Sequence, residues 1–245
     1  YDVDNNLLGD VVGTWTVGGG MGTCTPGYGS STVIDLITPG AGIITAIDGV
    51  HTGITGTITV DHGQMIGLRL TPSTYTLTAD DSLQYIATAK DADGNLWDVT
   101  EDVIWSEDDT IGTMADSIYY AGRTGNWTIT GTTGGMAATA TVGVKAGAFV
   151  NLNISAPATA TTLAPFQLSV SLYDNDGNPY SGPVALTNTT KSIIPDTVNM
   201  VSGTWTGTAT ITRSPNGGMD TIAVAYNATV TNTATITVFV NSERG

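Results

Sequence analysis

The sequence predicts an all-β protein built from antiparallel β-sandwiches in tandem. Three observations support this prediction: a composition rich in threonine and glycine, short segments in which apolar and polar residues alternate, and an acidic five-residue word that recurs along the chain. Glycine occurs 31 times and only 12% of residues are charged. Threonine and valine favour pleated, half-buried strands, and glycine supplies the tight turns between them. No segment shows a convincing helical pattern.

Four segments carry the clearest strand pattern. Their alternation places one face of each strand against a core and the other in water. Short strands with frequent turn signals are typical of antiparallel sandwiches. The segments are Ser82–Ala89, Phe166–Leu172, Thr204–Ile211 and Thr233–Val240.

The acidic word appears as DVDNN, DADGN and DNDGN, starting at residues 2, 91 and 174, at intervals of 89 and 83 residues. After the first two copies, leucine, valine and a tryptophan follow in the same order, ending at Trp15 and Trp105. A repeat of this length predicts three homologous units. We expect an incomplete or strand-complemented unit at 1–65 and complete units at 66–147 and 148–245, with boundaries near Gly63–Gly67 and Lys145–Phe149.

These residues resemble bacterial immunoglobulin-like domains. The second unit does so through LTPSTYTLTADDSLQYIATAKDADGN, the strand at Val103–Trp105 and the closing WTIT and ATATV runs. The third unit is similar to the invasin/intimin-type variant through LYDNDGNPYSGPVAL, GTWTGTATIT and TATITV. The resemblance implies tandem immunoglobulin-like sandwiches, and modules that act as spacers or as adhesive and assembly units.

The acidic word has two interpretations, a backbone turn and a calcium loop. A short hairpin loop commonly needs one residue with positive φ, which Gly94 and Gly177 provide, and Asn5 is the best substitute for glycine. Calcium requires six to eight oxygen ligands, and the distant bidentate glutamate of an EF-hand is absent. We therefore favour the turn, with no metal site. The weaker calcium candidates are Asp91, Asp93, Asn95, Asp174, Asp176 and Asn178.

Charge and composition exclude several other functions. A net charge of −15 and only seven Lys and Arg residues disfavour nucleic acid and anionic lipid as partners. The single cysteine, Cys24, allows no internal disulfide and is expected to be half-buried. His51 and His62 lie in turns without a partner at metal-ligand spacing, and are expected at the surface. No nucleophile elbow or zincin motif occurs, so we expect no catalytic residues and no enzyme activity.

Aromatic residues and sequons suggest weaker sites. Trp15 and Trp105 end apolar segments and are expected in the core, whereas Trp97 follows an acidic turn and is the best candidate for an exposed contact, such as stacking on a sugar. Asn188, in the TNTTKS loop, looks like the easiest target for glycosylation. The four N-x-S/T sequons are at Asn126, Asn153, Asn188 and Asn227.

The first unit lacks the two strands that precede the acidic word in the second unit, where they occupy Gly67–Lys90. An incomplete sandwich exposes apolar side chains and unpaired backbone groups. Three explanations remain open: the sequence belongs to a longer polypeptide, the segment GGGMGTCTPGYGSS covers the gap, or a neighbouring subunit donates the strand.

We therefore expect an extracellular structural protein, a subunit or stalk of a cell-surface filament, surface layer or adhesin. Its partners would be copies of itself or other envelope proteins. The alternatives are a module that binds a carbohydrate or host receptor at loops, and a non-catalytic appendage of a surface enzyme. No cofactor is expected.

Overall fold

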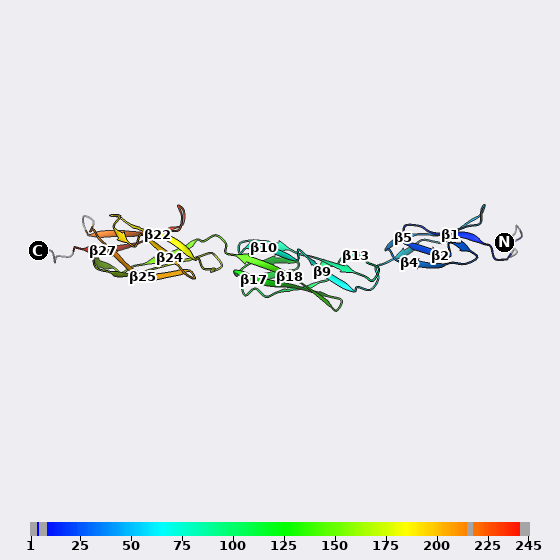
Figure 1. Ribbon diagram of the computed structural model, residues 1–245, viewed down its shortest axis with the longest axis horizontal. Coiled ribbons are helices and arrows are strands. Elements are labelled where there is room, and N and C mark those ends of the chain that lie inside the picture. Colours follow the sequence, from blue (N-terminus) through cyan, green and yellow to red (C-terminus); the bar gives the residue numbers. More distant parts are fainter. Residues whose placement is uncertain (1–3, 5–8, 215–217, 241–245) are drawn as a thin grey trace. The chain divides into compact units, whose positions relative to one another are not determined.

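A computed structural model describes residue 4, residues 9–214 and residues 218–240. In this part of the chain the regular structure is β-strand, apart from one 3₁₀ turn at Thr100–Asp102, which confirms the all-β prediction. Among the described residues there is no helix with the length and apolarity needed to cross a membrane. The chain divides into two compact units. Figure 1 labels strands along the chain. Unit 1 contains Tyr1–Thr71, Ile86–Ile104 and Gly131–Ala138; unit 2 contains Pro72–Tyr85, Trp105–Thr130 and Thr139–Gly245.

The N-terminal part of unit 1 consists of three small antiparallel sheets. One has the strand order β3–β1–β6–β7, and two further ladders pair β2 with β4 and β5 with β8. Strands β1 and β6 pair directly, as do β14 and β17. The bounds are β1 Gly13–Val17, β2 Gly22–Thr25, β3 Tyr28–Gly29, β4 Val33–Leu36, β5 Gly40–Gly42, β6 Ile44–Ile47, β7 Thr52–Ile54 and β8 Ile58–Val60.

The middle of the chain contributes strands to both units. The sheet β13–β12–β9 belongs to unit 1, whereas β11–β16–β15 and most of β10–β18–β17–β14 belong to unit 2. Strand β10 runs parallel to β18. The bounds are β9 Gly67–Thr71, β10 Thr74–Thr78, β11 Ser82–Gln84, β12 Ile86–Lys90, β13 Leu96–Asp98, β14 Ile104–Glu107, β15 Thr113–Ala115, β16 Ile118–Tyr120, β17 Gly125–Thr133 and β18 Met136–Lys145.

The prediction of one continuous strand at Ser82–Ala89 is wrong, because the segment changes pairing partner at Tyr85. Strand β11 pairs with β16, whereas β12 pairs with β9 and β13. The N–H of Tyr85 donates to the carbonyl of Ser117 at 2.8 Å. The alternating pattern therefore identified strand structure, but it held no information about the change of partner.

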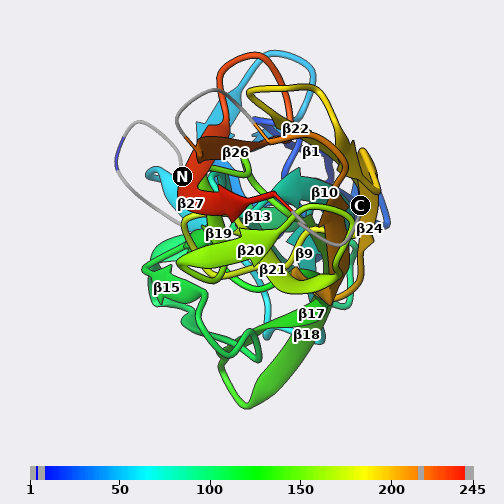
Figure 2. The same cartoon turned by 90° about the vertical axis from the view of Figure 1, so that its left-hand side faces the viewer.

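The C-terminal part of unit 2 is a sandwich of two sheets, ordered β19–β21–β25–β23 and β20–β27–β26–β22–β24. Figure 2 shows β22, β26 and β27 next to one another. An immunoglobulin-like sandwich places its first, second and fifth main strands in one sheet and its third, sixth and seventh in the other. The order found here follows this rule, which confirms the immunoglobulin-like fold. The bounds are β19 Asn151–Ser155, β20 Thr159–Thr161, β21 Phe166–Tyr173, β22 Gly182–Asn188, β23 Ile193–Ile194, β24 Thr197–Met200, β25 Thr204–Ile211, β26 Met219–Ala225 and β27 Thr231–Phe239.

The predicted segments Phe166–Leu172, Thr204–Ile211 and Thr233–Val240 correspond to β21, β25 and β27. Along β21 buried positions alternate with more exposed ones, as the sequence pattern predicts. The inward side chains of both sheets form one core. Its fully buried members include Leu168, Leu172, Val184, Met200, Ile211, Ile222, Val224 and Ile236.

The N-terminal region, residues 9–63, buries much less apolar surface. Met21 and Ile44 are its only buried large apolar side chains, with 0% and 4% of their surface exposed. Apolar side chains outside a core are ordinary when they are scattered, but a concentration of them marks an interaction surface. The exposed large apolar residues of this region are Val11, Val12, Tyr28, Val33, Ile34, Ile37, Ile47, Val50 and Ile54.

Candidate functional site

The loop Asp91–Asn95 connects β12 to β13 and is organised around one buried carboxylate. Asp91 is 1% exposed. Its Oδ1 accepts hydrogen bonds from the N–H groups of Asp93 at 3.1 Å and Asn95 at 2.9 Å. Its Oδ2 accepts from the N–H of Gly63 at 3.0 Å and from Nδ2 of Asn95 at 2.9 Å. Four N–H groups therefore satisfy this carboxylate.

The loop Asp174–Asn178 repeats the same pattern. Asp174 is 0% exposed, and its Oδ1 accepts from the N–H groups of Asp176 at 3.0 Å and Asn178 at 2.7 Å. Its Oδ2 accepts from the N–H of Gly147 and from Nδ2 of Asn178, both at 2.9 Å. The two loops thus share the same donors at the same sequence offsets, apart from one residue in the spacing to the glycine.

The glycines of both loops have the backbone conformation that the turn interpretation requires. Gly94 has φ of 90° and Gly177 has φ of 77°. The loops close with hydrogen bonds from Gly94 N to Asp91 O and from Gly177 N to Asp174 O. Asn5, the expected substitute in the first copy, lies outside the described residues.

Hydrogen bonding lowers the pKa of Asp91. The side chain of Asn95 makes the largest contribution; burial acts in the opposite direction, and the N–H groups of Gly63, Asn95 and Asp93 add to the lowering. A carboxylate that accepts several N–H bonds is stabilised in its charged form. These hydrogen bonds therefore stabilise the charged form of the Asp91 carboxylate.

The arrangement of the calcium candidates differs from that of a cation site. The buried carboxylates of Asp91 and Asp174 face N–H donors, and Nδ2 of each asparagine points toward the carboxylate as a further donor. Asp93 and Asp176 are exposed. Within the described ranges no three His, Cys, Asp or Glu side chains are grouped so that they could hold a metal. The absence of a metal site stays a prediction, and the donor geometry supports it.

Two further buried carboxylates were missed in the sequence. Asp109 is 6% exposed and accepts from Tyr119 Oη at 2.7 Å and from the N–H groups of Gly122 and Arg123 at 3.1 Å. Asp220 is 1% exposed and accepts from Nδ2 of Asn188 at 2.7 Å. Neither lies in a recurring word, so the sequence contained no signal that separates them from surface acids.

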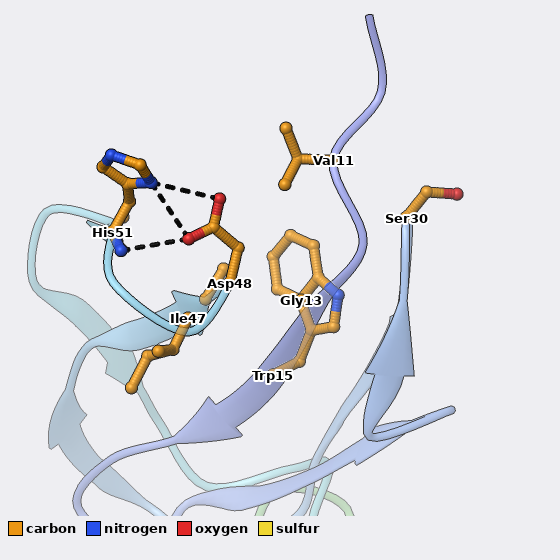
Figure 3. A pocket seen from close by; sticks show the side chains of 9 residues that line it. Val11, Gly13, Trp15, Ser30, Ile47, Asp48 and His51 are labelled. Carbon is orange, nitrogen blue, oxygen red and sulfur yellow. Dashed lines mark hydrogen bonds and ion pairs between the residues drawn. The ribbon is translucent and has the colours of Figure 1, made fainter.

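A hollow of about 300 Å³ lies against the sheet β3–β1–β6–β7 (Figure 3). Trp15, on β1, is half-buried and donates through Nε1 to the carbonyl of Gly29 at 3.0 Å. At the rim the backbone N–H of His51 donates to Asp48 Oδ1 at 3.0 Å, and the ring Nδ1 of His51 lies 3.1 Å from the same oxygen. The backbone hydrogen bond is the main cause that lowers the pKa of Asp48. The other lining residues are Val11, Gly13, Ser30, Ala46, Ile47 and Gly53.

The predictions for Trp15, Trp97 and Trp105 are wrong, whereas those for the two histidines and for Cys24 are confirmed. Trp15, on the inner strand β1, and Trp105, on the edge strand β14, are half-buried rather than core residues; the ring centroid of Trp105 lies 6.1 Å from that of Tyr85. Trp97, expected to be exposed, is half-buried because His62 stacks on it with ring centroids 4.4 Å apart. Both histidines, His51 and His62, are exposed as expected, and Cys24 is half-buried as expected.

The preference for Asn188 among the four sequons is wrong. Asn188 is 4% exposed, and its Nδ2 donates to Asp220, Thr190 and Ser192 inside the sandwich. The amide nitrogen that would carry a glycan is therefore committed to internal hydrogen bonds. Asn126, Asn153 and Asn227 are exposed, and whether they carry glycans stays a prediction.

Comparisons with known proteins give likenesses in structure alone. No family model and no curated protein sequence matches the chain. Domains 1–6 of the surface layer protein SbsC are 17% identical, with a TM-score of 0.35 over 98% of this chain and 37% of that one; this chain therefore spans little more than a third of its length. The adhesin InvE of Yersinia pseudotuberculosis is 16% identical, with a TM-score of 0.33 over 70% of this chain and 58% of that one.

The titin domains I67–I69, in an E-to-A mutated variant, are 13% identical, with a TM-score of 0.38 over 94% of this chain and 88% of that one. All three TM-scores lie below 0.5, so the immunoglobulin-like description of this chain rests on its own strand order.

Proposed function

We propose that the chain is a structural subunit of an extracellular assembly, such as a surface layer, a filament or the stalk of an adhesin, and that it has no catalytic activity. It would consist of three sandwiches, at residues 1–65, 66–147 and 148–245. The partners would be further copies of the chain or other envelope proteins. The observation that carries this proposal is the imbalance between buried and exposed apolar side chains in residues 9–63.

That region cannot be stable by its own core in the way that the C-terminal sandwich is. Two buried apolar side chains, Met21 and Ile44, bury far too little surface to offset the conformational entropy of ordering some fifty residues. Val33, on the short ladder of β2 and β4, is 72% exposed, and Ile54, on the edge strand β7, is 67% exposed. Apolar side chains beside unpaired strand edges favour addition of a strand from another molecule.

We assign the covering strand to a second copy of the chain. A net charge of −15 and abundant hydroxyl groups keep such a subunit soluble until its exposed strand edges pair with those of a second copy.

Self-association tests this proposal. Analytical ultracentrifugation and negative-stain electron microscopy of the whole chain should show concentration-dependent oligomers or filaments. Val33→Asp should weaken association at least tenfold, because it places a charge on the apolar surface, while thermal unfolding of the remaining sandwiches stays unchanged.

Val201→Asp is the matched control, since Val201 is 70% exposed but lies on the C-terminal sandwich. It should associate like the natural chain. A chain that stays monomeric at every accessible concentration, with residues 9–63 well folded, would contradict strand donation and self-assembly together.

A second candidate function is recognition of a carbohydrate in the hollow beside Trp15. An aromatic ring beside a carboxylate, an imidazole and a hydroxyl, here Asp48, His51 and Ser30, is a combination that suits the apolar face and hydroxyl groups of a sugar. A glycan array should then give binding that Asp48→Asn or His51→Ala reduces at least tenfold. His62→Ala, which removes an exposed histidine elsewhere, should have no effect, and an array without a hit would reject this candidate.

A further inference from the structure

We propose that the D-x-D-G-N word is a joint clamp. Its first residue, an aspartate, holds the connecting segment that leads into its own sandwich, and its last residue, an asparagine, holds main-chain groups of the preceding repeat. The clamp recognises backbone N–H and C=O groups and requires no cation. This inference rests on the proposed division of the chain into repeats, but not on the proposed self-assembly.

The first contact of the clamp is with the connecting segment. Asp91 accepts from the N–H of Gly63, 28 residues earlier, and Asp174 accepts from the N–H of Gly147, 27 residues earlier. Both glycines lie where the sequence predicts a boundary between repeats. A connecting segment bound in this way loses the freedom of an ordinary linker.

The second contact reaches further back. Nδ2 of Asn95 donates to the carbonyl of Ile37 at 2.8 Å, 58 residues earlier, and Nδ2 of Asn178 donates to the carbonyl of Gly122 at 2.9 Å, 56 residues earlier. Ile37 and Gly122 occupy corresponding places, in the segments that lead toward β6 and β17. The two joints are therefore built on one plan, although the sequences that they hold differ.

The second joint has additional contacts. Oδ1 of Asn178 accepts from the N–H of Thr124 at 2.9 Å, so the asparagine binds this segment through both its donor and its acceptor. Asp109 binds the N–H of Gly122 on the other side. The carboxylate of Asp80 also accepts from the N–H of Ala148 at 2.8 Å. The segment at Gly122 is thus held from two directions.

Close packing explains why glycine occupies the connecting segment. A Cβ atom on Gly147 would overlap the carboxylate of Asp80, and a Cβ on Gly63 would lie 3.3 Å from Oδ2 of Asp91. Glycine therefore leaves room for Asp80 at the second joint, and an added Cβ at the first joint would lie tightly against Asp91. Gly147→Ala is expected to open the second joint through this overlap.

The clamp also explains the form of the recurring word. The side chains that make contacts are the first Asp and the final Asn, and the glycine provides the positive φ. The middle carboxylates, Asp93 and Asp176, are exposed, and these residues contact the first aspartate of the loop through their main-chain N–H groups. A calcium loop would instead need the middle carboxylates as ligands.

Amide hydrogen exchange measured by NMR on the whole chain, below the concentration at which it associates, tests the clamp. Asp174→Asn should accelerate exchange about tenfold or more at Gly147, whose N–H donates to Asp174, the factor that one hydrogen bond to a carboxylate typically contributes. Exchange at Thr124 should rise as well, because Thr124 donates to Asn178, and Asp174 holds the side chain of Asn178. Asp176→Asn is the matched control, because it removes a carboxylate two residues away. The exchange rates of both amides should stay within twofold of those in the natural chain. Exchange at buried core amides such as that of Ile222 should not change, which shows that the sandwich stays folded.

A second variant, Asn178→Asp, removes the donor to Gly122 while preserving shape, and should broaden the distance distribution between spin labels placed on the two flanking repeats. Neither exchange nor distances should respond to millimolar Ca²⁺ or to EDTA. The inference is overturned if Asp174→Asn leaves Gly147 and Thr124 protected, if Asp176→Asn has the same effect as Asp174→Asn, or if Ca²⁺ protects these amides in the natural chain. Because the measurement uses the monomer, failure of self-assembly does not affect it.

Discussion

Replacing Met21 by alanine is expected to unfold residues 9–63 while the other sandwiches stay folded. Met21 is completely buried, and its side chain lies against Gly40 and Gly42 of β5, where added Cβ atoms would meet its Cγ at 3.7 Å and its Cε at 2.8 Å. Truncation of a buried methionine typically costs about 2–5 kcal/mol. In a region whose only other buried large apolar residue is Ile44, this loss removes most of the core.

The measurement is a two-dimensional NMR spectrum combined with thermal unfolding. Signals of residues 9–63 should collapse to unfolded positions while those of β21 and β26 persist. Met200→Ala is the matched control: Met200 is 2% exposed but belongs to the large C-terminal core, so its sandwich should lose stability and still unfold cooperatively. If Met21→Ala left residues 9–63 folded in the monomer, this region would not depend on its small core, and the argument that it needs a covering strand would be wrong.

The second large effect is expected at Asp109. Asp109→Asn should destabilise the middle of the chain by about 3 kcal/mol or more. The substitution replaces one of the two acceptor oxygens of the carboxylate by an NH2 group, which is a donor and faces the donors that Asp109 binds. Tyr119→Phe should reproduce part of this loss, because Tyr119 Oη donates to Asp109 at 2.7 Å. Tyr85→Phe is the matched control: Tyr85 is also buried, but its hydroxyl has no hydrogen-bond partner among the residues that the structure describes, so its removal should be neutral or stabilising.

The same aspartate makes stability depend on pH in a defined direction. Burial alone would raise the pKa of Asp109, but hydrogen bonds from Tyr119 and from the N–H groups of Ile111, Gly112 and Arg123 outweigh it, and the pKa is lowered below 3.8. The folded chain therefore binds this proton less readily than the unfolded chain. The stabilisation is complete above the unfolded pKa and is lost as the pH falls below 3.8 through the folded value.

Chemical denaturation at pH 7 and at stepwise lower pH measures this effect. The difference in unfolding free energy between the natural chain and Asp109→Asn should shrink as the pH falls below 3.8. Asp102→Asn is the control, since Asp102 is exposed. A difference that stays constant down to the acid transition would show that Asp109 is not ionised in the folded chain.

The sequence was most informative where local chemistry acts alone. Alternation located β21, β25 and β27, and the requirement for positive φ identified Gly94 and Gly177, because both depend only on the residue and its immediate neighbours. The same local patterns were misleading at Asn188, which a polar, turn-like segment placed at the surface. Its burial depends on Asp220, which is 32 residues away in the sequence.

By itself, then, the sequence determined that this chain forms β-sandwiches and that the glycines of the loops Asp91–Asn95 and Asp174–Asn178 allow the backbone to turn there. Only the tertiary structure showed what the word holds. The carboxylate of Asp174 and the amide of Asn178 meet groups at Gly147 and Gly122, 27 and 56 residues earlier. A turn needs only the conformational preference of a few adjacent residues, whereas a joint needs donors and acceptors that folding brings together, and no local pattern encodes their distance in space.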